Sequence, residues 1–251
     1  MIKIFRNLNE IGGKMEDIRQ KKSFLYSQSS LATFLACKKK FKYQYIDDIK
    51  WSGEDAELTE KFKKGEKFHT LAERYFTGIP TGEEFLEENE LKKYFENLKE
   101  TFLINKDYKY KAEYEIRIRN SNIKLMARYD LIIFKKDTVE IWDWKTGNKK
   151  LQERYQKDKL QTKIYLYLLK EILGGRVKSE NISMNYWQPQ YKNDWVTINY
   201  NEKMYNRTKK ELTELMDNIL KEENFEMTEY EKTCNYCEFE KICKTNNNIV
   251  K

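Results

Sequence analysis

One short run of residues has the types and spacing that could do chemistry. In Trp142-Asp143-Trp144-Lys145, aromatic and charged side chains alternate. Residues two apart on a β-strand share a face, so Asp143 and Lys145 should project together while Trp142 and Trp144 point the other way. The run therefore predicts a carboxylate and an ammonium group side by side on one strand.

A second carboxylate belongs to the preceding strand. Asp130 comes directly before the apolar residues 131–134, which predict a central and largely buried strand. A carboxylate there is costly unless it is paired, hydrogen-bonded or bound to a metal. Residues 135–137 form a short polar connection, as a hairpin turn would. Pairing around this turn could bring Asp130 and Asp143 close together.

Two carboxylates and a lysine on adjacent strands would suit a divalent cation beside a phosphodiester. Carboxylate oxygens are hard ligands that favour Mg²⁺ or Mn²⁺. Such a cation lowers the pKa of a bound water and neutralises developing phosphate charge, while a lysine can orient that water. The alternative is a buried ion pair between Asp143 and Lys145 that only supports the sheet. Because such triplets are common in charged sequences, Asp143-Trp144-Lys145 alone favours this alternative.

His69 is the only histidine in the 251 residues. It interrupts an apolar stripe at helical spacing, formed by Leu58, Phe62, Gly65, Ala72 and Phe76. Taken alone, such a histidine is typical of a core residue whose ring is satisfied by a backbone carbonyl.

Two further acids lie on the first predicted strand. We expect Glu113 and Glu115, with Arg117 and Arg119, to form a solvated charged face. Glu115 as an additional acid of the site is the alternative.

The cysteines have the spacing of a ligand set. Cys234, Cys237 and Cys243 form a Cys-x₂-Cys-x₅-Cys pattern, and Cys37 stands alone near the N-terminus. Disulfides are disfavoured, since we expect a reducing compartment. A four-thiolate zinc site and a four-thiolate [4Fe–4S] cluster are equally reasonable from the spacing. Four free thiols are the remaining alternative.

The periodic segments predict a mixed α/β domain with a helical N-terminal elaboration. Helical spacing dominates residues 24–105. The segments that follow read, in order, as three strands of an antiparallel meander, a helix, two strands and a helix, at residues 114–118, 123–134, 138–146, 160–171, 182–188, 195–200 and 203–221.

Composition excludes several other classes of protein. The chain is 39% hydrophobic and 35% charged, with 18 Tyr and 13 Phe to build a core, so global disorder is disfavoured. No apolar run approaches the roughly 20 residues that span a bilayer, and residues 1–22 do not resemble a secretory signal. We therefore expect a soluble, cytoplasmic protein that contacts no membrane. The net charge of +7 suits a phosphate-bearing partner without requiring one.

Taken together, these motifs resemble the RecB-like branch of the PD-(D/E)XK nuclease superfamily, over nearly the whole chain. Asp130 followed by Asp143-Trp144-Lys145 matches the core signature of an acid, a gap, and then acid-x-Lys. Gly65-Glu66-Lys67-Phe68-His69 matches the upstream helical histidine of that branch, and Gln161-Thr162-Lys163-Ile164-Tyr165 matches its Gln-x-x-x-Tyr motif. Ala127 departs from the glycine that often precedes the first acid.

The resemblance implies a fold and a set of domain parts. The fold is a mixed central sheet flanked by helices, a restriction-endonuclease-like core with a helical N-terminal elaboration and a C-terminal cysteine segment. The whole chain, 1–251, would be a single nuclease domain. Its parts would be a helical part with the first cysteine, the core and the cysteine segment, at residues 24–105, 106–226 and 227–251.

The resemblance also implies roles in a DNA nuclease. His69, Asp130 and Asp143 would bind Mg²⁺ or Mn²⁺, together with the backbone carbonyl of Trp144. Lys145 would position or activate the attacking water. The remaining implied contacts would be Gln161 and Tyr165 holding the strand, with Lys149, Lys150 and Arg154 contacting phosphates.

For the cysteines, the resemblance favours iron over zinc. Nucleases of the AddB type and of the CRISPR-associated spacer-acquisition type carry one cysteine before the core and three after it. Cys37, Cys234, Cys237 and Cys243 have a similar layout, which implies a structural [4Fe–4S] cluster, with zinc as the less favoured occupant. The implied substrate is DNA with single-stranded ends, with protein partners in CRISPR adaptation or recombinational repair. The alternative function is an inactive nucleic-acid-binding or scaffold subunit of a DNA repair or recombination complex.

Overall fold

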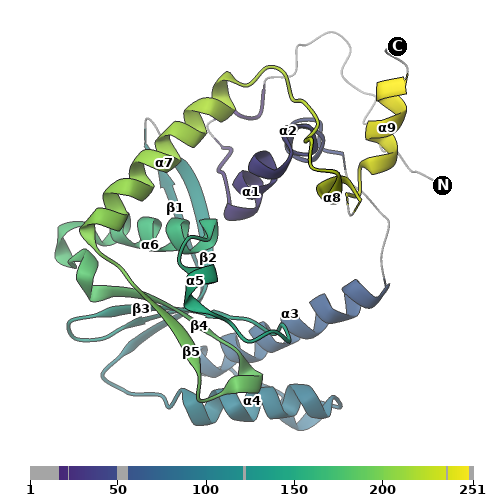
Figure 1. Cartoon of the computed structure of the whole chain (residues 1–251). Helices are drawn as coiled ribbons and strands as arrows, with labels where there is room; N and C mark the ends of the chain where they lie inside the picture. Colours follow the sequence, from purple (N-terminus) through teal and green to yellow (C-terminus); the bar gives the residue numbers. More distant parts are fainter. Residues whose placement is uncertain (1–16, 22, 50–55, 121–122, 236, 249–251) are drawn as a thin grey trace. The chain divides into compact units, whose positions relative to one another are not determined.

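The computed structural model describes residues 17–21, 23–49, 56–120, 123–235 and 237–248. The chain divides into two compact units (Figure 1). The larger unit contains residues 56–118 and 126–212, and the smaller contains residues 1–55, 119–125 and 213–251. The domain boundaries implied by the sequence stay a prediction.

The larger unit is built on a five-stranded sheet in the order β1-β2-β3-β4-β5. Pairing is antiparallel between β2 and β3, parallel between β3 and β4, and antiparallel between β4 and β5. The hairpin predicted at residues 135–137 is confirmed, because the Lys135 amide donates to the Thr138 carbonyl at 2.9 Å. The strands are β1 (Lys109–Arg119), β2 (Lys124–Phe134), β3 (Val139–Trp144), β4 (Ile182–Trp187) and β5 (Trp195–Asn199).

A helical crossover joins the parallel strands β3 and β4, as parallel pairing requires. Its main helix is α6 (Leu160–Leu173), which packs against β4 through the Thr162 and Tyr186 hydroxyls, 2.7 Å apart. Because Tyr186 pairs with Asp143 in register, α6 covers the sheet face that carries Asp143. The crossover also contains α5 (Glu153–Gln156) and 3₁₀ turns at Gly174–Arg176 and Ser179–Asn181.

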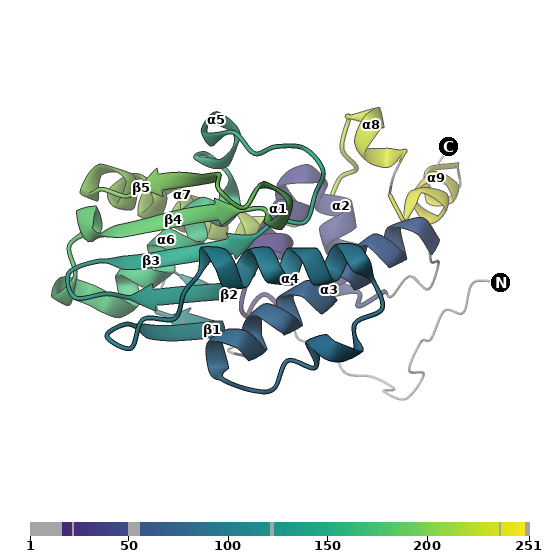
Figure 2. The same cartoon turned by 90° about the horizontal axis from the view of Figure 1, so that it is seen from below.

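The other face of the sheet is covered by α3 (Ala56–Thr77) and α4 (Asn89–Thr101), which lie side by side in Figure 2. Phe102, directly after α4, lies at the centre of the aromatic core between them and the sheet. Its ring centroid is 4.7 Å from that of Trp142, 5.1 Å from Trp144 and 5.2 Å from Trp187. The two tryptophans of β3 therefore anchor that strand in the core. Short 3₁₀ turns at Glu83–Phe85 and Pro189–Tyr191 complete the unit.

The buried face of α3 differs from the predicted stripe. Phe68 and Leu71 are buried, together with Ala72, whereas His69 is only partly covered. The larger apolar side chains occupy the core, which turns the neighbouring face of the helix, with Gly65 and His69, toward the edge of the sheet. The side chains of Leu58 and Phe62 lie outside the described residues.

The smaller unit is helical. Its first helix begins with a capping box, in which Ser27 and Ser30 each accept a hydrogen bond from the other's backbone amide. Arg19 donates to the carbonyls of Ile219 and Glu222, both at 2.6 Å, and so satisfies the end of α7. The helical segments are α1 (Gln28–Ala36), α2 (Lys38–Phe41), a π-helical turn (Lys42–Ile46), α8 (Glu231–Cys234) and α9 (Glu240–Asn248), while α7 (Glu202–Lys221) contributes residues to both units.

The predicted fold class is confirmed: a mixed sheet flanked by helices, with a helical N-terminal region. Among the described residues, none of the helices has both the length and the apolar character needed to cross a bilayer.

Candidate active site

Asp130 lies where β2 and β3 part. The last register pair between the two strands is Leu131 with Trp142. Beyond it, the Trp144 amide donates to Asp130 Oδ2 at 2.7 Å, so a side-chain oxygen takes the place of the next backbone acceptor. This bond fixes one oxygen of the carboxylate and leaves Oδ1 to face α3.

Asp143 is buried in the sheet, and its carboxylate contacts two polar side chains. Its side chain is 3% exposed, and its Oδ2 lies 2.5 Å from Lys145 Nζ. Gln161, in the first turn of α6, donates from Nε2 to Asp143 Oδ1 at 2.5 Å and accepts from Lys145 Nζ at 3.3 Å. The predicted pairing of Asp143 and Lys145 on one face is therefore present, and Gln161 holds both groups.

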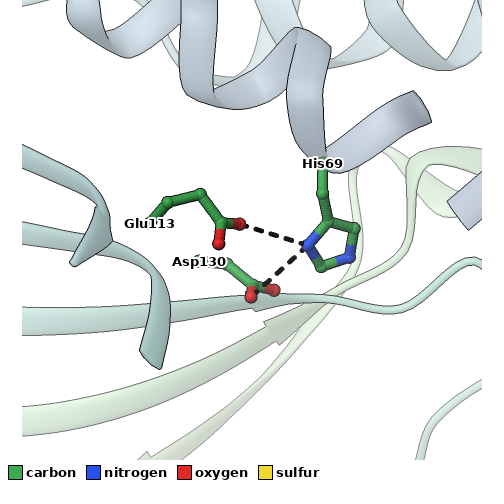
Figure 3. Close-up of side chains that lie close together, drawn as sticks. All are labelled: His69, Glu113 and Asp130. Atoms are coloured by element: carbon green, nitrogen blue, oxygen red, sulfur yellow. Dashed lines mark ion pairs between the residues drawn. The ribbon is translucent and has the colours of Figure 1, made fainter. Parts of the chain in front are cut away.

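His69 reaches the site from α3, and an unexpected acid meets it there. His69 Nδ1 lies 3.4 Å from Asp130 Oδ1 and 3.6 Å from Glu113 Oε1 (Figure 3). These three side chains place one ligand-type atom each within 4.8 Å of one another, and they form the one such group in the described part of the chain. The reading of His69 as a core residue with a backbone partner does not describe this environment.

The expectation for Glu113 was wrong. It was placed on a solvated face with Glu115, but its carboxylate lies 3.6 Å from His69 Nδ1. Glu115 instead pairs with Arg117 and lies 3.8 Å from Arg128. The difference is that α3 brings His69 to Glu113, whose backbone adopts a left-handed conformation with φ +45°.

His69 and Glu113 line a cavity of about 750 Å³. Its lining carries three carboxylates besides the imidazole, and Arg128 is the basic residue among them. A phosphodiester would be repelled by this lining unless a cation neutralised it. Gly65 brings α3 close to the end of β3, since a Cβ at this position would lie 3.4 Å from Thr146 Oγ1. The lining residues are Gly65, Glu66, His69, Thr70, Glu73, Glu113, Arg128 and Thr146.

The charges of the site influence one another strongly. Burial raises the pKa of Asp143 well above its ordinary value, and the nearby Asp130 carboxylate raises it further, while Lys145 opposes both. Burial alone would lower the pKa of His69, but its hydrogen bonds to Asp130 and Glu113 raise it to about 10. Two carboxylates therefore favour a positive charge at this point of the fold, which is the electrostatic condition for holding a cation.

The donor set fits a divalent metal ion. An imidazole nitrogen with carboxylate oxygens suits Mn²⁺, and the carboxylates suit Mg²⁺. His69 and Asp130 would be ligands, and the Asp130 carboxylate is near enough to Asp143 to raise the pKa of Asp143 beyond the effect of burial. The Trp144 amide is engaged by Asp130, and a role for its carbonyl stays a prediction.

Tyr165 in α6 and Lys159, the residue before α6, are influenced by the charged groups of the site. Burial raises the pKa of Tyr165, and the Asp143 and Asp130 carboxylates raise it further, so its phenol stays protonated. Lys159, which sequence reasoning missed, immediately precedes α6. Burial lowers its pKa and so does the charge of Lys145, which shows that the two ammonium groups are near each other. Its position two residues before Gln161 was the available signal.

The predicted phosphate-contacting residues lie on the segment that follows β3. Lys150 pairs with Asp194, and Arg154 lies over the ring of Tyr155 at 4.6 Å. Lys149 is exposed, and only its backbone carbonyl makes a described contact. The structure thus leaves the Lys149 and Arg154 side chains at the surface, and their contact with DNA stays a prediction.

Gln188 holds this segment in place and was not foreseen. Its buried amide donates to the carbonyls of Gly147 at 2.6 Å and Lys149 at 3.0 Å, and accepts from the Leu151 amide at 3.0 Å. Its partners are backbone groups of a distant loop, and no sequence pattern marks such contacts.

The four cysteines gather in the smaller unit as free thiols. Burial raises the pKa of Cys243, and the charges of Cys37, Cys234 and Cys237 raise it further, against Lys39. Cys37 also caps α2, accepting from the Lys40 amide at 3.4 Å. What the cysteines bind stays a prediction.

Comparison with known protein families agrees with the geometry of the site. A model described as the PD-(D/E)XK nuclease superfamily matches residues 26–113 and 86–244, and these overlapping matches take in most of the chain. The chain belongs to the PD-(D/E)XK nuclease superfamily. Nucleases of this superfamily generally use divalent metal ions, which is consistent with the donor set around Asp130.

Solved structures show the same fold. A crystal structure named "Putative exonuclease", from Eubacterium rectale, is 13% identical in sequence, with a TM-score of 0.52 over 88% of this chain and 87% of that one. A second structure, SSO0001, is 17% identical over 89% of this chain and 87% of that one, but its TM-score of 0.42 is too low to support an argument. No curated protein matches the sequence.

Proposed function

We propose that this PD-(D/E)XK superfamily member is a divalent-metal-dependent deoxyribonuclease of the RecB-like type that processes single-stranded DNA ends. The observation that carries the proposal is the meeting of Asp130, Asp143 and Lys145 at the point where β2 and β3 part, with His69 opposite. The name of the Eubacterium rectale structure agrees with exonucleolytic cleavage.

Each residue has a task that follows from its position. When bound, the divalent cation would acidify a water and neutralise charge on the scissile phosphate. His69, Asp130 and Asp143 would hold it. Lys145 projects beside Asp143, where its ammonium group can donate a hydrogen bond to the attacking water or to a phosphate oxygen. Gln161 keeps that ammonium group in place.

The cysteines support a second part of the proposal, a structural [4Fe–4S] cluster. Four free cysteines in one compact unit provide the number of thiolates that such a cluster needs. Protein purified without oxygen should be brown and contain iron. Colourless protein with one zinc per chain would replace the cluster by a zinc site and leave the nuclease proposal unchanged. With the cluster, the chain would act in CRISPR adaptation or recombinational repair.

The nuclease proposal is tested by substituting the lysine. Lys145→Ala should lower Mn²⁺-dependent degradation of labelled single-stranded DNA by about 10²- to 10⁴-fold, because it removes the donor that aids proton and charge transfer. Circular dichroism should show that the variant stays folded. Lys136→Ala, in the exposed turn between β2 and β3, is the matched control and should cleave like the wild type.

Absence of cleavage by the wild-type protein with Mg²⁺, Mn²⁺ or any other divalent metal would contradict the proposal. The protein would then be better described as a nucleic-acid-binding or scaffold subunit.

A further inference from the structure

Glu113 is the acid of the site that the nuclease signature does not contain. It enters from β1, whereas Asp130 comes from β2, Asp143 from β3 and His69 from α3. Its carboxylate lines the same cavity as His69, and its Oε1 lies 3.6 Å from His69 Nδ1 (Figure 3). We propose that Glu113 is a ligand of the divalent cation, which binds between His69 Nδ1, Asp130 Oδ1 and Glu113 Oε1. This inference rests on the proposed function and deepens it.

The distances between the three atoms suit a shared ion. Metal–ligand bonds of about 2.0–2.2 Å place two neighbouring ligand atoms of one ion about 3.0–3.6 Å apart. The His69–Asp130 and His69–Glu113 separations, 3.4 and 3.6 Å, fall in this range. Both carboxylates address the same ring nitrogen, so an ion there would contact all three groups at once.

The second oxygen of Asp130 explains why this arrangement is fixed. Asp130 Oδ2 is occupied by the Trp144 amide, so Oδ1 is the oxygen that faces His69. Trp144 is itself anchored among the aromatic rings of the core. Asp130 therefore presents one preoriented oxygen, and Glu113 presents another within 4.8 Å of it.

A proton is the competing occupant of this position. An imidazolium shared between Asp130 and Glu113 would show the same separations and would make Glu113 a partner of His69 alone. The two explanations differ in what happens when the Glu113 charge is removed. If Glu113 is a ligand, removing its charge breaks a direct metal–oxygen bond and strongly lowers the affinity for the cation. If it only pairs with His69, the direct bonds to the cation are kept.

The experiment is direct Mn²⁺ titration of DNA-free protein by calorimetry, at one fixed pH, with two isosteric variants. Glu113→Gln should raise the dissociation constant by more than about 100-fold, beyond the roughly 10- to 100-fold loss of groups that only support metal ligands. A smaller loss would make Glu113 a partner of His69 alone and overturn the inference. Glu115→Gln is the matched control, since Glu115 is on the same strand but pairs with Arg117 and Arg128 and not with His69, and it should bind within about twofold of the wild type. Mn²⁺ taken up by the cysteines would be common to all three proteins.

A second variant guards against a folding defect. Glu113→Gly lacks the side-chain oxygen that would bind the cation. Glycine adopts a φ of +45° without strain, so the fold should persist. It should lose as much affinity as Glu113→Gln. Wild-type affinity in both variants would overturn the inference.

The outcome also separates this inference from the nuclease proposal. Binding that depends on Glu113, in a protein that cleaves no DNA, would support the ligand and contradict the nuclease. If the wild-type protein cleaves DNA but its Mn²⁺ affinity does not change when Glu113 is substituted, the nuclease proposal is supported and the ligand role of Glu113 is contradicted.

Discussion

At the scale of single residues, Gln161 connects the buried acid Asp143 with the neighbouring Lys145. Its amide donates to Asp143 and accepts from Lys145, so one side chain sets the position of an acid and of the lysine beside it. It is able to do so because it lies in the first turn of α6, directly over the face of β3 that carries both.

We expect Gln161→Ala to lower kcat for cleavage about 10- to 100-fold while KM for DNA stays nearly constant, as for other residues that orient catalytic groups. Steady-state kinetics on single-stranded DNA would measure both parameters. Gln20→Ala, an exposed amide in the smaller unit, is the control and should behave as wild type. A rise in KM without loss of kcat would instead assign Gln161 to DNA binding.

The residues of the site differ in how far the sequence reveals them. Alternation along β3 was enough to put Asp143 beside Lys145, and the polar turn at residues 135–137 correctly paired β2 with β3. Glu113 was missed because its partner, His69, belongs to a helix distant in sequence, and no pattern in the sequence places that helix over β1. Gln188 was missed because its partners are backbone groups of a loop.

At the scale of secondary-structure elements, β3 is positioned by the aromatic core beneath it. Trp142 and Trp144 alternate with Asp143 and pack on Phe102, which is 8% exposed. Every displacement of these rings would shift the strand that carries the acid. The stability of the core and the geometry of the site are therefore linked through one strand.

Phe102→Ala should destabilise the protein by about 3–5 kcal/mol, because it leaves a cavity between three tryptophan rings. Urea denaturation followed by tryptophan fluorescence would measure this loss. Leu103→Ala is the neighbouring control: its side chain is 78% exposed, and the change should stay within about 0.5 kcal/mol. Equal effects of the two substitutions would contradict the packing described.

At the scale of the whole molecule, the chain separates its chemistry from its cysteines. The acids, His69 and Lys145 belong to the larger unit, and all four cysteines belong to the smaller one. The smaller unit is assembled from both ends of the chain, so a cofactor bound to Cys37 and Cys243 would close a very long loop. Such a cofactor would stabilise that unit without taking part in cleavage.

Cys37→Ser should therefore lower the iron content and increase amide hydrogen exchange across the smaller unit, with little change in the larger one. Serine can still cap α2, so a lost helix cap would not account for the effect. Mass spectrometry of exchanged peptides would locate the change. Wild-type protein stripped of iron should show the same pattern, and uniform exchange across both units would count against a local structural cofactor.

Gly65 lets α3 lie close to the segment that follows β3, because it lacks a side chain. A methyl group there would only touch Thr146, at 3.4 Å, whereas a branched residue would wedge the helix away from the strand end. His69 lies one turn later on the same helix. The side chain at residue 65, which contacts no ion itself, would therefore change the distance between the His69 imidazole and the carboxylates. Substituting residue 65 with side chains of increasing size would widen this gap step by step and change the size of ion that fits it.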